Sequence, residues 1–447
     1  VGPYLFYWKF DDIDTANFLK PPSSSHLLGT TSAGRDVMAL MLRGLGKSLL
    51  IGFLVAIIQT SIAAMVGASA AYIGGWYEKA ILWVVDLLLV GCVFLATSFG
   101  ALMVYSTTRG ATPPYETGFL KRVIMFMIIG AVLMAATALF DYRRLRDYWP
   151  FIYGGSVALL VLVLVPAFGE SRSGTQGWFQ VGPFQLQPSE LAKLGMIIGF
   201  AGLASQFRGD LDTTRVLMLL GLCGLPMGLV MLQPDLGTTL VSVAVSFALL
   251  LVAGVRPRVL GVLAVGAVLI TTLVLTSGVL KEYQVARLTT YVRQDQAVTS
   301  ETDEATRYNL DQAKLAVSSG GLTGQGLFNG TQTRTGMVPE QRTDFIFTAV
   351  GEQLGFVGCG VLLGLLGVIV WRVWRAAQLA RDDFGTLLCT GIMVMIVIQI
   401  FENIGMTIGI MPITGIPLPF VSYGGSALLT MFLSIGLVLS VHMRRFS

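Results

Sequence analysis

The chain has 447 residues, of which 54% are hydrophobic and 13% are charged, and its mean hydropathy is +0.72. Water-soluble proteins carry about 25% charged residues, so this composition excludes a soluble globular enzyme, a disordered chain and a disulfide scaffold. The formal charge of +4 and the absence of a long basic run give no reason to expect a nucleic acid partner. The sequence predicts a polytopic membrane protein.

Cysteine and histidine narrow the chemistry that the chain can perform. The four cysteines lie in apolar stretches without a CxxC pair, which favours packing over metal or redox chemistry. The two histidines, His26 and His442, lie near opposite ends of the chain. The sequence therefore offers no zinc site and no Ser-His-Asp triad, and we expect any catalytic acid or base to be a carboxylate.

Several apolar segments are long enough to cross a bilayer, whose core of about 30 Å needs about 20 helical residues. We predict eleven spans, at approximately 48–73, 81–106, 123–140, 149–168, 189–205, 214–232, 237–254, 259–280, 345–370, 385–405 and 424–442. The largest gap between spans is 281–344, which is polar and rich in Gly, Thr and Gln. We therefore expect an all-α membrane protein in which residues 281–344 form a large loop.

The basic residues predict how the chain is oriented. Lys and Arg are more frequent in one set of alternating short loops, which contains Arg143, Arg256 and Arg372 and ends with Arg444. Positively charged loops stay in the cytoplasm. We therefore expect a cytoplasmic C-terminus and a 281–344 loop on the outer side.

The beginning of the chain differs in character from the rest. Residues 26–89 contain the segment GTTSAGRD (29–36), followed by an apolar helix. This stretch resembles the start of a dipeptide or oligopeptide ABC-transporter permease, in which such a segment lies outside the membrane. The cytoplasmic coupling loop of that family has no match downstream. We therefore expect residues 1–80 to be a permease-like fragment with one transmembrane helix.

From about residue 91 onward, six motifs follow one another in order. They are FLATSFGALMVYS, QPSELAKL, QPDLGTTL, AVSSGGLTGQGL, VPEQRTDFIFTAVGEQLGF and ENIGMTIGIMPITGIPLPFVSYGGS. Together they resemble the SEDS family of peptidoglycan glycosyltransferases, RodA and FtsW, and the last motif is closer to RodA. The resemblance implies a ten-helix module over residues 81–447 in a bacterial plasma (inner) membrane.

The resemblance also implies a reaction and a partner. The chain would polymerise lipid II into glycan strands for cell-wall elongation and cell shape, using the undecaprenyl-diphosphate-linked glycan as donor. A class B penicillin-binding protein, which is a transpeptidase, would be its partner. Two alternatives remain open. One is a flippase that moves lipid II across the membrane without making bonds, and the other is a truncated peptide permease.

Asp344 is the leading candidate for the catalytic carboxylate. It is the last charged residue before residues 345–347 begin a span, so we expect it at the boundary between water and lipid. Desolvation there favours the neutral carboxyl, whereas neighbouring Arg342 favours the carboxylate. From the residues alone, a helix-capping aspartate and a general base both stay open. In the SEDS family the Asp of this motif is the essential catalytic residue, so the resemblance assigns that role to Asp344.

Glu190 and Lys193 are charged residues inside a predicted membrane helix, where a buried charge is costly. Their spacing of three places them on one face, where they can pair. A structural ion pair and a Lys193 that faces an anionic substrate both fit this pattern. We expect Ser189 to cap this helix and Asp235 to cap the helix that starts near residue 237, although a catalytic or ligand role for Asp235 stays open.

A departing diphosphate accumulates negative charge, so cations should stand near it. The candidate substrate-binding residues are Arg109, Glu190, Lys193, Arg287 and Arg342. A divalent cation, Mg or Mn, would suit the oxygens of a diphosphate, but the sequence shows no ligand cluster for it.

Three further segments are candidates for shaping the site. The glycines of residues 320–326 permit positive φ and a close approach of substrate, or form a plain turn. Residues 294–307 are acidic and polar, and we expect them to be solvated. Residues 421–426 open the last helix with amides that either cradle an anion or only start the helix.

Overall fold

The computed structural model describes parts of residues 12–41 and residues 75–110, 115–166, 168–172, 175–181, 184–207, 211–276 and 301–445. It divides the chain into two compact units, Val1–Val85 and Asp86–Ser447. The predicted span 48–73 lies outside the described residues. The assignment of residues 1–80 to a separate fragment therefore stays a prediction.

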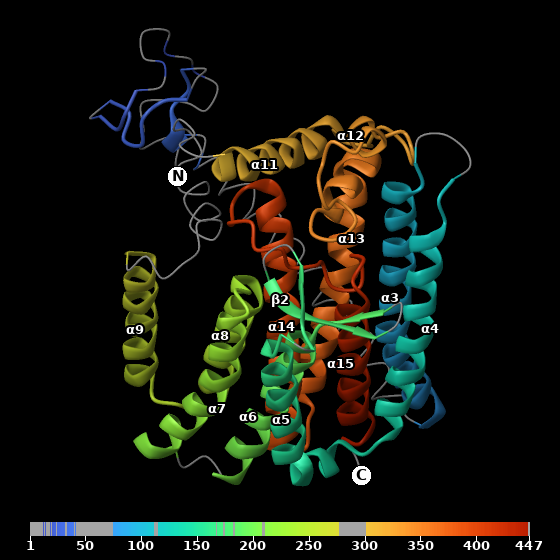
Figure 1. The fold of residues 1–447 in the computed structure, drawn as a ribbon, viewed down its shortest axis with the longest axis vertical. Coiled ribbons are helices and arrows are strands. Elements are labelled where there is room, and N and C mark those ends of the chain that lie inside the picture. The colour runs from blue at the N-terminus through green and yellow to red at the C-terminus, as the bar shows by residue number, and fades with distance from the viewer. Residues whose placement is uncertain are drawn as a thin grey trace. The chain divides into compact units, whose positions relative to one another are not determined.

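Long apolar helices make up most of the described chain (Figure 1). They are α3 (Gly75–Thr108), α4 (Gly118–Leu139), α5 (Tyr142–Leu164), α6 (Pro188–Gln206), α7 (Thr213–Leu232), α8 (Leu236–Val252), α9 (Pro257–Thr276), α13 (Ile346–Gln378), α14 (Asp383–Ile408) and α15 (Gly425–Met443). Within the described residues, seven helices are long and apolar enough to cross a membrane. The chain is a helical, polytopic membrane protein, and the total of eleven spans stays a prediction.

Small residues let neighbouring helices of Asp86–Ser447 approach closely. On α15, Gly436 lies against Thr137 of α4, where a Cβ atom would overlap the Thr137 hydroxyl. On α6, Gly195 and Gly202 lie against Ser156 and Trp149 of α5 in the same way. Membrane helices gain contact area by such close packing, because lipid provides no hydrophobic drive for helix association. These two helix pairs are accordingly the most extensive helix contacts in the bundle.

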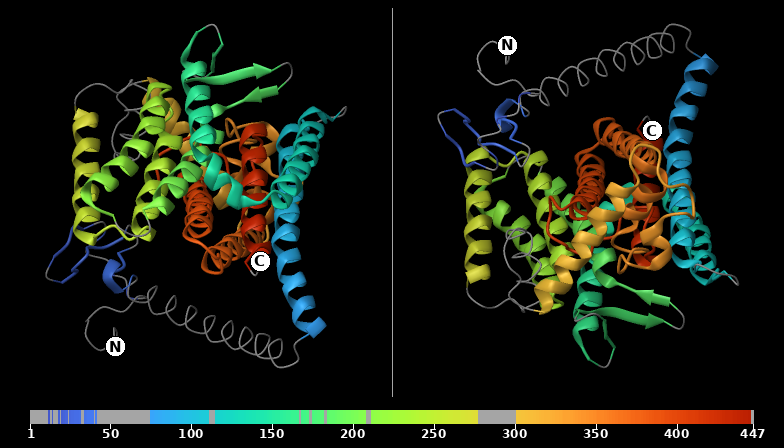
Figure 2. Two further views of the ribbon diagram at one scale, coloured as in Figure 1. Left: turned by 90° about the horizontal axis from the view of Figure 1, so that it is seen from below. Right: turned by 90° about the horizontal axis from the view of Figure 1, so that it is seen from above.

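The end-on views show the order of the helices across the bundle (Figure 2). Helices α13, α14 and α15 lie in the middle, with α3 and α4 on one side and α9 at the opposite edge. The central helices carry many of the fully buried side chains of the core, among them Phe384 of α14 and Phe432 of α15. The outer helices expose long apolar side chains such as Phe151 and Leu139, as expected for surfaces that face lipid.

The fold is all-α in class, as predicted, and one short segment of the bundle forms strands. Strands β1 (Glu170–Arg172), β2 (Thr175–Val181) and β3 (Phe184–Leu186) form an antiparallel sheet in the order β1-β2-β3. Phe179 pairs with Leu186 across β2 and β3. The alternation of polar and apolar residues in β3 is typical of a strand. These strands are too short to be recognised as membrane-spanning segments.

The predicted connecting loop 281–344 contains two helices in its second half, neither of them a candidate membrane span. Helix α11 (Glu301–Ser319) lies across the end of the bundle opposite the C-terminus (Figure 1). It buries Leu310, Ala313 and Ala316 in a small core with Phe345 and three other apolar residues. The short helix α12 (Thr331–Thr335) follows. Because α11 is amphipathic, only one of its faces is apolar, and a search for uniformly apolar spans overlooks it.

Helix α13 is interrupted at Gly355, whose φ of 64° and ψ of −161° are not helical. Residues 320–326 pack into this interruption. The Gln325 amide donates to the Glu352 carbonyl at 2.9 Å, and the Phe356 amide donates back to this segment. Three glycines of the segment adopt positive φ, as predicted: Gly321, Gly324 and Gly326. Of these three, Gly324 lies against the backbone of α13, where a Cβ atom would overlap the Gln353 carbonyl.

Candidate functional site

A polar cavity of about 610 Å³ lies at one end of the helices of Asp86–Ser447. Five of the described helices begin at or beside it. Its lining includes Phe119 and Arg122 of α4, Gln187 before α6, Asp235 before α8, Asp344 before α13, and Gly424, Gly425 and Ser426 at the start of α15. A helix N-terminus carries unpaired N–H groups and about half a positive charge. The five N-termini, with Arg122 and Arg342, contribute positive potential to a cavity that also holds the carboxyl groups of Asp235, Glu340 and Asp344.

Sequence and local geometry explain why these helices begin where they do. Asp235 is the N-cap of α8, and its carboxylate accepts from the Thr238 amide at 3.0 Å and from the Thr238 hydroxyl at 2.8 Å. The predicted Asp235 cap is confirmed. The N-cap of α6 is Gln187, with Pro188 in the first turn, and Ser189 makes no capping bond. The predicted Ser189 cap is therefore wrong, because the helix begins two residues earlier than a Ser189 cap requires.

The start of α15 is tied to the small sheet across the cavity. The Ser426 hydroxyl accepts from the Gln187 amide at 2.9 Å and donates to the Gln185 carbonyl at 3.0 Å. Gly424, the N-cap of α15, makes no side-chain capping bond. Gly424, Gly425 and Ser426 line the cavity, and residues 421–426 stay candidates for holding an anion.

Asp344 and Arg342 both line the cavity, and both are half-buried. The turn before them folds back at Glu340, whose φ of 47° lies in the left-handed region. The Glu340 carbonyl accepts from the amides of Thr343 and Asp344 at 3.2 and 3.1 Å. The N-cap of α13 is Phe345, without a side-chain capping bond. Asp344 therefore precedes the helix, and its position does not match the simple capping interpretation.

Aromatic rings and arginines line one wall of the cavity. The Arg342 guanidinium lies over the Phe119 ring at 4.9 Å from its centroid. Phe119 in turn meets Tyr423 edge to face, with centroids 5.2 Å apart. Trp178 of β2 and Arg122 of α4 also line the cavity. Flat apolar faces beside cations and carboxylates can hold a ligand that has both a ring and a charged group.

The structure does not bring all the predicted residues to this cavity. Glu190 and Lys193 form the predicted ion pair, with Nζ and Oε1 2.7 Å apart, and both are at most 3% exposed. Neither lines the cavity. Arg109 lies between the rings of Tyr115 and Phe328, at 4.7 and 4.3 Å from their centroids, and it does not line the cavity either.

Arg287 and residues 294–300 lie outside the described residues. Sequence reasoning missed Arg122 and Trp178 as lining residues, and it singled out the segment that contains Tyr423 for its backbone amides and not for this side chain. A basic residue in the first turn of an apolar helix is a usable signal for Arg122, because such a residue lies near the membrane boundary. No comparable signal exists for Trp178 and Tyr423, because their place in the cavity depends on the packing of β2 and α15.

A buried polar cluster lies on the helices next to the cavity. In the described part of the chain, no hydrogen-bond partner is found for either carboxyl oxygen of Glu402 on α14, for the second carboxyl oxygen of Glu190, or for the hydroxyl of Ser189. Glu402 is 1% exposed. A charged residue in a membrane helix is a functional candidate by default, and this rule applied to the span 385–405 would have found Glu402.

The described residues do not by themselves form a metal site. In that part of the chain, no three residues among His, Cys, Asp and Glu come together as ligands. The cavity carboxyl groups of Asp235, Glu340 and Asp344 are oxygen donors, and the last two belong to one turn before α13. We therefore derive no step through a metal ion.

These features define a class of protein, a multi-pass membrane protein with a cavity at one end of its helices that is lined by arginines, carboxylates and aromatic rings. The chain belongs to the FtsW/RodA/SpoVE family of cell cycle proteins, whose model matches residues 86–446.

Similar proteins come from several branches of this family. Stage V sporulation protein E of Bacillus subtilis is 36% identical over 364 residues, which cover 80% of this chain and 96% of that protein. The probable peptidoglycan glycosyltransferase FtsW of Geobacter metallireducens is 34% identical over 80% of this chain and 95% of its own length. The peptidoglycan glycosyltransferase MrdB of Escherichia coli K12 is 34% identical over 77% and 91%.

Solved structures agree with this assignment. A chain from a study of the structural coordination of polymerization and crosslinking by a peptidoglycan synthase complex matches with a TM-score of 0.66 and 29% identity. The match covers 82% of this chain and 98% of that one. The rod shape determining protein RodA of Thermus thermophilus matches with a TM-score of 0.59 and 28% identity, over 80% and 97%. Relatives from sporulation, division and rod-shape groups are therefore similarly distant from this chain.

Proposed function

We propose that this chain is a membrane-embedded peptidoglycan glycosyltransferase that polymerises lipid II, with Asp344 as its general base. The observation that carries the proposal is the position of Asp344 in a polar cavity on which five helix N-termini converge. Membership of a family whose relatives are named peptidoglycan glycosyltransferases supports the reaction class.

The proposed reaction is a single displacement at the anomeric carbon of the donor. The sugar hydroxyl of lipid II attacks that carbon, and its proton passes to the Asp344 carboxylate. A glycosidic C–O bond forms as the bond to undecaprenyl diphosphate breaks, and the anomeric configuration inverts. Proton transfer by a positioned carboxylate contributes typically 10²–10⁴-fold to a rate, so the loss of Asp344 should be severe.

The leaving diphosphate takes up negative charge, and the cavity offers two kinds of positive partner. Arg122 and Arg342 supply full charges, and the first turns of α13 and α15 supply N–H groups and the positive ends of helix dipoles. Arginine suits this task because its planar group donates to two phosphate oxygens at once. A Mg or Mn ion brought in with the diphosphate would add to this charge.

Polymerisation of lipid II by the purified chain tests the proposal. We expect glycan strands from the wild type and none from Asp344→Asn, which keeps the shape of the side chain and removes the base. Asp383→Asn is the matched control, because it makes the same change in the first turn of α14 at an exposed position. It should polymerise at the wild-type rate.

The flippase alternative predicts a different pattern in the same variants. A transporter tolerates Asp344→Asn, because transport requires no proton transfer. If neither wild type nor variant makes glycan while fluorescent lipid II still crosses vesicle membranes, the chain is a flippase.

The proposal includes a location and a partner. We place the cavity end outside a bacterial plasma membrane and the C-terminus in the cytoplasm, in agreement with the distribution of Lys and Arg. A class B penicillin-binding protein would crosslink the strands, and the peptidoglycan synthase complex among the similar structures supports such a partner. The residues 402–426, NIGMTIGIMPITGIPLPF in their core, favour a role in elongation like that of RodA.

The proposal also assigns residues 1–80 a regulatory role, which is to limit access of the partner. Residues 26–89 resemble the start of an ABC-transporter permease, and an added helix there could block the surface that the partner needs. Deletion of residues 1–80 should then increase partner capture and polymerisation. Unchanged capture and unchanged rod-shape complementation would dispose of this role.

A further inference from the structure

Asn403 joins two segments of the cavity wall. It lies on α14 and is fully buried. Its amide nitrogen donates to the Asp344 carbonyl at 2.7 Å and to the Ile416 carbonyl at 2.8 Å. The side chain of one helix residue thus holds the backbone of the proposed general base and the backbone of a second segment.

Neither of these segments has regular secondary structure of its own. Residues 340–345 lead into α13, and residues 410–424 connect α14 to α15. Both contribute to the cavity lining, the first through Asp344 and the second through Thr414 and Pro417. Irregular backbone keeps its shape only through bonds to something rigid, and α14 is the rigid element here.

Two further contacts fix the same junction. The Tyr423 amide donates to the Arg342 carbonyl at 2.9 Å. Gly237, in the first turn of α8, packs so closely on Ile416 that a Cβ atom would lie 2.7 Å from its side chain. The segment that carries Ile416 is therefore fixed against α8 as well, and Asn403 transmits that position to Asp344.

The chemistry of an amide explains why asparagine occupies this position. A primary amide has two N–H donors at a fixed angle in one plane, so it can hold two carbonyls in a fixed relation. An aspartate carboxylate of the same shape donates to neither, and a leucine leaves both carbonyls without a donor.

We infer that Asn403 is a positioning residue for the glycosyl transfer, holding Asp344 in line with the attacking hydroxyl of lipid II. The inference rests on the proposed function. A misplacement of about 1 Å at a reacting group can cost about 100-fold in rate. The loss of Asn403 should therefore lower kcat by about 100-fold and leave the KM for lipid II within about threefold.

Thr407 provides a matched control on the same helix. It is also fully buried, and its hydroxyl donates at 2.8 Å to the Asn403 carbonyl within α14. Thr407→Val therefore removes one buried hydrogen bond without touching either cavity segment. It should lower the unfolding temperature somewhat and leave kcat near the wild-type value.

The experiment measures kcat, KM for lipid II and the thermal unfolding midpoint for wild type, Asn403→Leu, Asn403→Asp and Thr407→Val in the full chain. A fall in kcat confined to the Asn403 variants, at an unchanged KM, supports the inference. A kcat within threefold of Thr407→Val, a loss carried by KM, or failure of both Asn403 variants to fold overturns it. An inactive wild type removes the proposed function and this inference together, whereas an active wild type with unaffected Asn403 variants removes only the inference.

Discussion

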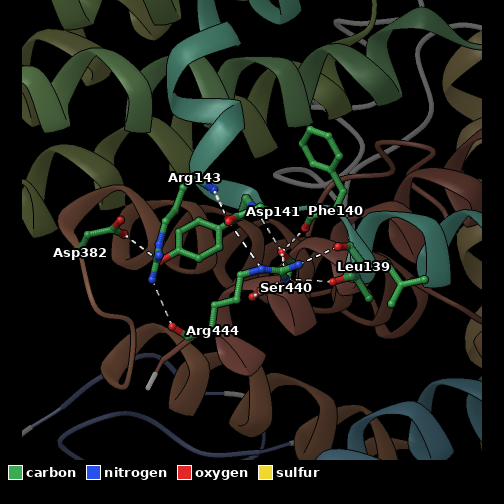
Figure 3. A network of polar contacts seen from close by, with 9 residues as sticks. Leu139, Phe140, Asp141, Arg143, Asp382, Ser440 and Arg444 are labelled. Atoms are coloured by element: carbon green, nitrogen blue, oxygen red, sulfur yellow. Dashed lines mark hydrogen bonds and ion pairs between the residues drawn. The ribbon is translucent and has the colours of Figure 1, made fainter. Parts of the chain in front are cut away.

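The two ends of the helix bundle differ in how their polar groups are hydrogen-bonded. At the end away from the cavity, Arg444 donates to the carbonyls of Ala138 and Leu139 at the C-terminus of α4 and to the Ser440 hydroxyl (Figure 3). The same hydroxyl donates to the Phe140 carbonyl. The last carbonyls of α4, which no helix can satisfy internally, are thus bonded to α15.

At the cavity end, buried polar atoms are left over. In the described residues, Glu402, Glu190 and Ser189 all have side-chain oxygens without a hydrogen-bond partner. Native proteins pair most of their buried polar atoms, and each exception calls for an explanation. The Trp149 indole nitrogen, near the opposite end, also has no partner among the described residues, so the ends differ in kind: carboxyl oxygens stay unbonded beside the cavity, whereas the carbonyls that end α4 are bonded to the segment that ends α15.

The largest effect should come from the ion pair next to the cavity. Lys193→Met leaves the Glu190 carboxylate buried without its cation, which should lower the free energy of unfolding by about 3–5 kcal/mol. The double variant with Glu190→Gln removes both charges and should recover most of that loss. Because neither residue lines the cavity, we expect the polymerisation rate of the double variant to stay within tenfold of the wild-type rate. A stable but inactive double variant would show that Lys193 faces substrate.

The opposite end should show a smaller effect, on stability alone. Arg444→Met removes a charged donor from the carbonyls of α4, which should cost about 1.5–3 kcal/mol. Polymerisation per folded molecule should not change. Arg381→Met, at an exposed position on the same side, should shift stability by less than about 0.5 kcal/mol. A loss of catalysis in folded Arg444→Met would contradict a purely structural role for this end.

Two substitutions of Asp235 distinguish its role as the N-cap of α8 from the effect of its negative charge. Asp235→Ala removes the N-cap of α8 and should cost about 1 kcal/mol, whereas Asp235→Asn keeps a good cap. The unfolding midpoints of the two variants measure this difference. Equal destabilisation by both would mean that the charge, and not the cap, stabilises this helix start.

The smallest expected effect is a pH dependence of stability in Val1–Val85, where His26 is paired with two carboxylates. Both ring nitrogens of His26 face carboxylates, with Nδ1 at 2.8 Å from Asp36 and Nε2 at 3.2 Å from Asp14. Burial alone would lower the pKa of His26, but the hydrogen bonds and charges of Asp36 and Asp14 outweigh it and raise the pKa above 6.5.

A raised pKa in the folded state fixes the sign of the pH dependence. The stabilising contribution of His26 is complete below its unfolded pKa and is lost as the pH rises through the folded value. Protease cleavage within residues 12–41 of the full chain should therefore accelerate as the pH rises from about 6.5 upward. His26→Gln should cleave at a rate that does not follow pH in this window, and a flat wild-type profile would contradict the assignment.

The sequence predicts the helices well and the site only in part. The predicted spans 214–232 and 385–405 lie within a few residues of α7 and α14, because continuous apolar segments are a local property. The pairing of Glu190 with Lys193 and the cap at Asp235 are also local, and both are confirmed.

The parts that sequence reasoning misses depend on contacts between distant segments. The amphipathic α11 and the small sheet lack a continuous apolar run. Arg109 lies outside the cavity because its guanidinium packs between the rings of Tyr115 and Phe328. Phe328 is more than two hundred residues away from it in the chain. Tertiary packing decides such placements, and no local pattern predicts them.

The break in α13 has a consequence for where the lipid tails of a substrate can lie. An unbroken helix of 33 residues would be about 50 Å long, well beyond the hydrocarbon thickness of about 30 Å. The residues after Gly355 form a helix of about 35 Å, long enough to cross the hydrocarbon core without the turns before Gly355. Those turns, with Asp344 just ahead of them, then lie at the height of the headgroups. Under the proposed function, a polyprenyl chain would then remain among the acyl chains while its sugar reacts in the polar layer above.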